Sequence, residues 1–159
     1  MKRLLMSWGQ SLCVGAVAAA VLTVGLSFSV NAGDDPIASR KAMMQTVKAA
    51  TKLSVGMVKG ERPFDPAVAE LAVRAMNTAA SGVVNFFPES SKTGGKTTAS
   101  PKIWEDMAGF KAKMAKFEAD TAKAVKAAAN GADAFKVAFG AATKNCKGCH
   151  QEYRVKKKK

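Results

Sequence analysis

The sequence predicts an all-α fold, an antiparallel up-down-up-down four-helix bundle, and three observations support this prediction. Alanine and lysine, which favour helices, are abundant in the chain. Apolar residues recur at intervals of three and four in four successive segments, and no alternating pattern typical of a strand persists. Finally, several segments open with a capping residue followed by proline, a common way to begin a helix.

The first two helices each have such a start. With Asp35 as N-cap and Pro36 at its first position, the first helix is expected to run to about Gly60. The second begins after Asp65-Pro66 and stops at Pro88. The residues predicted to face inward are Ile37, Arg40, Met44, Val47, Thr51, Val55 and Val58 in the first helix, and Val68, Leu71, Ala75, Thr78, Gly82 and Phe86 in the second.

The last two helices follow a loop from Pro88 to Ser100, which is long for a bundle connection. The third helix is predicted to start at Ser100-Pro101 and to end at Asn130-Gly131. The fourth runs from about Ala132 to Cys149. The predicted inward residues alternate in steps of four and three in the third helix; they are Ile103, Met107, Phe110, Met114, Phe117, Thr121 and Ala124, followed in the fourth by Phe135, Phe139, Ala142, Cys146 and Cys149.

The start of the chain has the features of a secretory signal peptide. A charged Lys2-Arg3 pair precedes an apolar run from about Leu12 to Val30, and Val30-Asn31-Ala32 fits the small-residue rule for cleavage. The run approaches the roughly 20 residues of a membrane span, but its Ala, Gly and Ser content and the cleavage site favour removal. We therefore expect a signal peptide at residues 1–32, a single exported domain at 33–159, and a periplasmic location.

The chain is strongly basic, with a formal net charge of +13. Four of the positive charges are the terminal run Lys156 to Lys159. Nucleic-acid binding is disfavoured, because the protein is expected to be exported and no aromatic residues are interleaved with the basic ones. The charge instead suggests a surface that attracts acidic partner proteins or membrane headgroups.

One motif carries chemistry, and it lies close to the end of the chain. Cys146-Lys147-Gly148-Cys149-His150 is the attachment signature of c-type haem. On a helix the two cysteines share one face, so both sulfurs can form thioethers with the porphyrin. His150, the only histidine in the sequence, can then ligate the iron. The motif predicts one haem c per chain.

Three other interpretations of the motif are weaker. A zinc site needs a fourth Cys or His ligand, which residues 33–159 lack. A disulfide between Cys146 and Cys149 leaves the histidine unexplained, and His150 could be simple polar surface. Because no Met or His follows His150, a sixth iron ligand would have to come from an upstream helix. The candidates are Met43, Met44, Met57, Met76, Met107 and Met114.

The chain after the signal peptide resembles the cytochrome c′ family, the class II c-type cytochromes. The resemblance rests on "RKAMMQTVK", "KGERPFDPAV", "SPKIW" and "CKGCHQEYR". The last motif is common to all c-type cytochromes, whereas its combination with the four-residue spacing from Arg40 to Met44 is more specific. The resemblance implies a four-helix bundle with haem attached near the C-terminus, and in many members a homodimer formed through the first two helices.

The resemblance also implies roles for single residues. Cys146 and Cys149 would form the thioethers and His150 would be the axial iron ligand. Arg40 would lie near a haem propionate, and Met44 over the distal side of the iron. Arg154 would shield the proximal side of the haem. From the residues alone, Arg40 could instead extend to solvent at the bundle end, and Met44 could simply fill the core.

These alternatives divide the predicted function. If Met44 ligates iron, the centre is low-spin and suits electron transfer between protein partners. If Met44 only crowds the site, the iron is high-spin and five-coordinate, and it would bind NO or CO. Peroxidase-like catalysis ranks below both, because no second histidine follows the signal peptide to act as an acid–base group. The sequence predicts a non-enzymatic electron carrier, with gas binding as the alternative.

Overall fold

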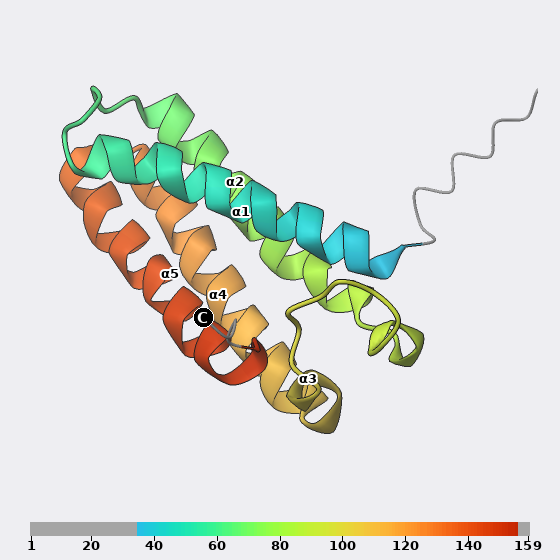
Figure 1. The fold of residues 1–159 in the computed structure, drawn as a ribbon. Coiled ribbons are helices and arrows are strands. Elements are labelled where there is room, and N and C mark those ends of the chain that lie inside the picture. The colour runs from blue at the N-terminus through green and yellow to red at the C-terminus, as the bar shows by residue number, and fades with distance from the viewer. Residues whose placement is uncertain (1–34, 156–159) are drawn as a thin grey trace, which may run out of the picture. The chain divides into compact units, whose positions relative to one another are not determined.

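This computed structural model describes residues 35–155, so the predicted signal peptide, its cleavage site and the Lys156–Lys159 run lie outside the described residues. Four long helices form the bundle (Figure 1): α1 (Pro36–Val58), α2 (Pro66–Gly82), α4 (Met107–Ala128) and α5 (Ala132–Tyr153). The connection between α2 and α4 holds two short 3-10 helices, η1 (Val83–Phe86) and η2 (Glu89–Ser91), and the single-turn α3 (Lys102–Glu105). The predicted all-α four-helix bundle is confirmed.

The cap-and-proline starts of the first two helices are also confirmed. A side-chain oxygen of Asp35 accepts a hydrogen bond from the Ala38 amide at 2.9 Å. An oxygen of Asp65 accepts from the amides of Ala67 and Val68 at 2.9 and 3.1 Å. These contacts satisfy amides that have no partner within the first turn of a helix.

The third predicted helix is not continuous, so that prediction is wrong in part. Ser100 Oγ accepts from the Lys102 amide at 3.3 Å, as expected of a helix start. The chain then leaves helical geometry at Asp106, where φ is −134° and ψ is 58°. The Asp106 carboxylate accepts from the Gly109 amide at 3.0 Å and begins α4 anew. Aspartate competes for backbone amides in this way, which makes it a better cap than an interior helical residue.

The inward faces agree with the prediction in α4 and α5 but not in α2. Phe110, Met114 and Phe117 are buried in α4, as are Phe135 and Phe139 in α5. In α2, Leu71 is 69% exposed, and the buried residues lie on a face rotated from the predicted one. That face consists mainly of small side chains: Ala69, Ala72, Val73, Met76, Ala79 and Ala80. In the second half of α1 the stripe also shifts, because Ala50, Ser54 and Met57 are buried while Val55 and Val58 are only partly so.

The four long helices do not pack equally closely. The α1–α2, α2–α4 and α4–α5 pairs make extensive contact, whereas α1 and α5 touch far less. In Figure 1 the blue-green α1 and the red α5 are the first and last helices of the bundle. The weakly packed α1–α5 side is where a group could enter between helices. No helix within residues 35–155 is long and apolar enough to span a membrane.

Candidate haem site

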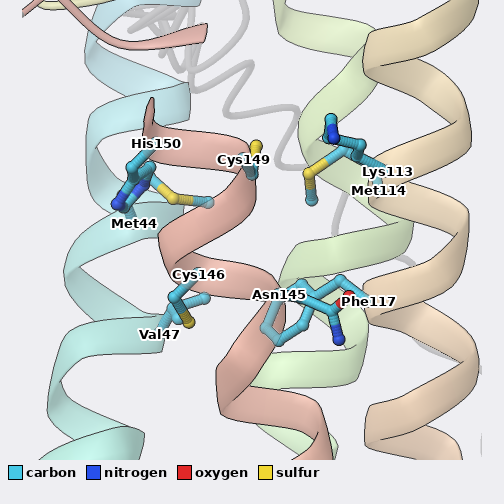
Figure 2. A pocket seen from close by; sticks show the side chains of 9 residues that line it. All are labelled: Met44, Val47, Lys113, Met114, Phe117, Asn145, Cys146, Cys149 and His150. Atoms are coloured by element: carbon cyan, nitrogen blue, oxygen red, sulfur yellow. The ribbon is translucent and has the colours of Figure 1, made fainter. Parts of the chain in front are cut away.

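A cleft opens between α1, α4 and α5, on the weakly packed side of the bundle. Its cavity volume is about 50 Å³. Figure 2 shows the side chains that surround it from the three helices. They are Met44, Val47, Lys113, Met114, Phe117, Asn145, Cys146, Cys149 and His150.

The residues of the Cys-x-x-Cys-His motif come together on one wall of this cleft. Cys146 and Cys149 are one turn apart on α5 and both are half-buried, and neither is in a disulfide among the described residues. His150 follows directly on the same helix and lines the cleft with part of its surface, although the residue as a whole is exposed. One helix therefore presents two thiols and one imidazole to the same space.

Burial shifts the ionisation of these three groups towards their neutral forms. It raises the pKa of both the Cys146 and the Cys149 thiol. Burial also lowers the pKa of the His150 imidazole, and the positive charge of Arg154 lowers it further. A neutral imidazole keeps a free nitrogen lone pair, which is the form that binds a metal.

Met44 lies on the opposite wall of the cleft. It is half-buried on α1 and lines the cleft together with Val47, which is one turn further along. In Figure 2 the α1 helix that carries Met44 faces the α5 helix that carries His150. Of the other methionines considered from the sequence, Met114 of α4 also lines the cleft.

Arg40 lies one turn before Met44 but is not among the cleft-lining residues. Its guanidinium is buried against the α2–α4 connection and forms hydrogen bonds with several residues of that loop. It donates to the carbonyl of Phe86, to both Oγ and the carbonyl of Ser91, and to Thr97 Oγ1, over 2.8 to 3.2 Å. It also lies over the ring of Phe87, 4.7 Å from its centroid. Burial lowers the pKa of Arg40.

Arg154 is at the end of α5 and is exposed. Its Nε donates to Thr98 Oγ1 at 3.2 Å. The residue forms an isolated antiparallel bridge with Ala99, so the end of α5 lies beside the long connection. Arg154 does not line the cleft, and its effect on His150 is through its charge.

A polar cluster that no sequence pattern predicted lies beside the first cysteine. Asn145 lines the cleft and donates to the buried carboxylate of Asp120 on α4 at 3.0 Å. Lys116 and Lys123 donate to the same carboxylate. These hydrogen bonds, chiefly that from Lys116 and then that from Asn145, hold the pKa of Asp120 well below its usual range. Lys113 is the other lining residue without a sequence signal, since an isolated lysine or asparagine on a helix is ordinarily solvated.

The residues of the cleft fit a haem in their chemistry. The wall from α5 carries the two thiols and the imidazole that covalent attachment and axial ligation use. Met114, Phe117 and Val47 supply an apolar lining. Outside the cleft lining, one turn before Met44, Arg40 has a spare donor, because its buried Nε has no hydrogen-bond partner among residues 35–155. The cavity of about 50 Å³ is smaller than a porphyrin, so the helices or the lining side chains would have to move apart to hold one.

Comparison with known proteins agrees with this assignment. The sequence model of the family described as Cytochrome C′ matches residues 35–154. Cytochrome c′ of Rhodopseudomonas palustris is 39% identical over 142 residues, which cover 89% of this chain and 96% of that protein. Cytochrome c-556 of Agrobacterium fabrum is 32% identical over 146 residues, covering 92% of this chain and 89% of that protein.

Solved structures give the same result. The structure of the Rhodopseudomonas palustris cytochrome c′ superimposes with a TM-score of 0.71 at 39% identity, covering 78% of this chain and 98% of that one. A variant of cytochrome c prime from Alcaligenes xylosoxidans in complex with nitric oxide gives a TM-score of 0.70 at 31% identity, covering 77% and 95%. The chain therefore belongs to the cytochrome c′ family of haem proteins, and its cofactor is haem c.

Proposed function

We propose that this protein is a periplasmic electron carrier in which Cys146 and Cys149 attach the haem and His150 is an axial ligand of its iron. The observation that carries the proposal is the shared cleft: the two thiols and the imidazole line one wall, and Met44 lines the wall opposite. When bound, haem c supplies an iron that exchanges one electron between its ferric and ferrous forms.

The residues of the cleft would exclude water from the haem and provide its ligand in the right protonation state. The apolar side chains of Val47, Met114 and Phe117 would keep water away from the porphyrin. A dry surrounding limits how much solvent must reorganise when the iron changes charge. The neutral form of His150, favoured by its lowered pKa, would be ready to bind iron at neutral pH.

Met44 is proposed as the sixth ligand, and Arg40 as a propionate partner. For Met44 the support is its place on α1, across the cleft from His150. For Arg40 it is the buried Nε that has no partner within residues 35–155. Arg154 would act from the proximal side through its positive charge, which already lowers the His150 pKa.

The test is the optical spectrum of the purified protein and two matched variants. The ferric protein should show a sulfur–iron charge-transfer band at the red edge, and Met44→Ala should abolish it. Met43→Ala is the control, because Met43 is a half-buried neighbour on the same helix whose terminal methyl lies against Gly82 of α2 and not in the cleft. The control should keep the band.

A high-spin ferric spectrum that Met44→Ala leaves unchanged would contradict the electron-carrier proposal. The second candidate is then the function, a five-coordinate haem that binds NO or CO. One observation favours it: a substituted variant of a relative that is 31% identical has been solved in complex with nitric oxide. Addition of CO to the reduced protein separates the two, because only an open coordination position binds CO without displacing a ligand.

The partners and the location follow from the same proposal. Without Lys2 and Arg3 the formal charge falls from +13 to +11, which still favours acidic redox partners, whose association with this protein should weaken as salt is added. The periplasmic location and cleavage after Ala32 are tested by sequencing the N-terminus of the exported protein. A homodimer through α1 and α2 is supported by Leu71, an exposed leucine on α2, and it is tested by the molar mass in solution.

A further inference from the structure

The last turn of α5, immediately after His150, is fastened to the start of α4 by side chains. Tyr153 Oη donates to the Asp106 carboxylate at 2.6 Å. Asp106 is the residue that breaks the predicted third helix and caps α4. The hydrogen bond from Tyr153 is the largest reason why the pKa of Asp106 is lowered, and it raises the pKa of the Tyr153 phenol.

Gly109 makes room for this hydrogen bond. A methyl group added at Gly109 would lie 2.6 Å from Tyr153 Oη and would also collide with the Asp106 carboxylate. Real Cβ atoms essentially never approach other atoms so closely. The junction of Asp106, Gly109 and Tyr153, which we call the latch, therefore depends on a glycine in the first turn of α4.

Two further sets of contacts hold the same turn. Glu152 forms ion pairs with Lys102 at 2.9 Å and with Lys113 at 3.0 Å. The Ser100 amide donates to the Tyr153 carbonyl at 3.0 Å, and the Val155 amide donates to the Thr98 carbonyl at 2.9 Å. Every residue from Glu152 to Val155 is thus tied to α3, α4 or the loop before them.

His150 itself has no comparable support. Histidines that ligate metals usually donate their second ring N–H to a carboxylate or carbonyl, which fixes the ring. Among residues 35–155 no side-chain hydrogen bond reaches the His150 ring, and none of the ion pairs includes it. Its orientation must therefore come from the helix that carries it, and the fixed part of that helix is the turn that follows.

We propose that the latch of Tyr153, Asp106 and Gly109 is a positioning device for His150, setting the direction from which the imidazole meets the haem iron. The inference rests on the proposed role of His150 as axial ligand. Tyr153 is three residues after His150 and so lies on the adjacent turn of the same side of α5. Releasing the latch lets this end of α5 rotate or fray, which changes the iron–histidine bond without removing it.

The experiment compares the ferric electron paramagnetic resonance spectrum of the holoprotein. It also compares the iron–histidine stretching band, measured by resonance Raman spectroscopy on the reduced protein in a Met44→Ala background, where the iron has no sixth ligand and the band is observable. Tyr153→Phe removes only the hydroxyl. Gly109→Ala keeps every hydrogen-bonding group but fills the space that Tyr153 Oη occupies. We expect both variants to shift and broaden the band in the same direction, with haem still attached.

Two controls separate positioning from general stability. Gly140→Ala makes the same chemical change on α5, where the added methyl meets no atom within 4 Å. Asn77→Ala removes the interhelix hydrogen bonds to the Glu118 carbonyl and to Thr121 Oγ1, and Asn77 does not line the cleft. Both control spectra should overlay those of the unmodified protein.

The outcomes distinguish this inference from the proposed function. If the unmodified protein carries no haem, the proposed function fails. If it carries haem and Tyr153→Phe and Gly109→Ala both give its unaltered spectra, the latch is not a positioning device. Should Gly109→Ala fail to fold, Tyr153→Phe alone decides, because it adds no atoms. A shift that Asn77→Ala reproduces would also overturn the inference, because it would then reflect lost stability.

Discussion

The α2–α4 interface and the α1–α5 side of the same bundle differ in nearly every physical respect. α2 buries alanines against its neighbours, including Ala69 and Ala80, and helices with small side chains can approach closely. Asn77 of α2 adds hydrogen bonds to the Glu118 carbonyl and to Thr121 on α4, at 2.8 and 3.0 Å. The α1–α5 side has little direct contact and a cleft lined by sulfur, imidazole and aromatic groups.

The difference shows how one bundle separates stability from function. Close packing on one side fixes the positions of α2 and α4, and α4 in turn supplies Met114 and Phe117 to the cleft. The cleft side can then remain weakly packed and accept a large group without loss of the fold. Substitutions at the packed interface should therefore cost stability, whereas those at the cleft should change the haem.

The largest expected effect is at the core. Met76 of α2 is fully buried, so Met76→Ala should lower the free energy of unfolding by about 2–5 kcal/mol. Val137→Ala on α5 is the control, and it should cost under about 0.5 kcal/mol because Val137 is 76% exposed and lies outside the proposed dimer helices. Urea unfolding followed by circular dichroism measures both. Equal losses in the two variants would mean that the buried face of α2 is wrongly assigned.

A smaller loss is expected from the polar contact across the α2–α4 interface. Asn77→Ala should lower the free energy of unfolding by about 1 kcal/mol, a typical net contribution of a hydrogen bond. The optical spectrum of the haem should not change. A spectral change here would show that the two sides of the bundle are coupled after all.

On the cleft side we expect a small effect on stability and a clear effect on the haem spectrum, the opposite of the packed interface. Met44→Ala should cost roughly 1 kcal/mol in urea unfolding, because Met44 is only half-buried. It should nevertheless change the visible spectrum, which Met76→Ala leaves alone. A loss of stability as large as that of Met76→Ala would show that Met44 acts mainly by packing in the core and not at the haem.

The smallest expected effect is on the stability of the protein at acidic pH. The pKa of Asp120 is lowered in the folded protein, mainly by the hydrogen bond from Lys116, so the folded state favours its ionised form. This stability is fully present above the unfolded aspartate pKa of about 3.9 and is lost as pH falls towards the lower folded pKa. Asp120→Asn should therefore be less stable at pH 7 but lose less stability below pH about 4. Parallel pH profiles of the melting temperature would contradict this.

The sequence predicted those features that depend on strong local signals. Asp35-Pro36 and Asp65-Pro66 fixed two helix starts, and the large apolar side chains of α4 and α5 fixed their inward faces. The face of α2 was mispredicted because a single leucine, Leu71, outweighed several alanines whose burial has little hydropathic signal. The break at Asp106 depends on a tertiary partner, Tyr153, that is 47 residues away.

The candidate site was predictable to a similar extent. The Cys-x-x-Cys-His spacing identified Cys146, Cys149 and His150, and the helical period placed Met44 on the inward face of α1. Asn145 and Lys113 were missed, because their place in the cleft depends on α4 and α5 packing side by side. The hydrogen bonds of Arg40 to Ser91 and Thr97 could not be predicted either, because these partners lie in a loop, whose conformation leaves no periodic pattern in the sequence.

The mass of the protein purified from cells that mature c-type cytochromes tests the central claim most directly. The account predicts the mass of residues 33–159 plus one haem, and the bare polypeptide mass for the variant that combines Cys146→Ala with Cys149→Ala. A bare polypeptide mass for the unmodified protein from those cells would contradict it.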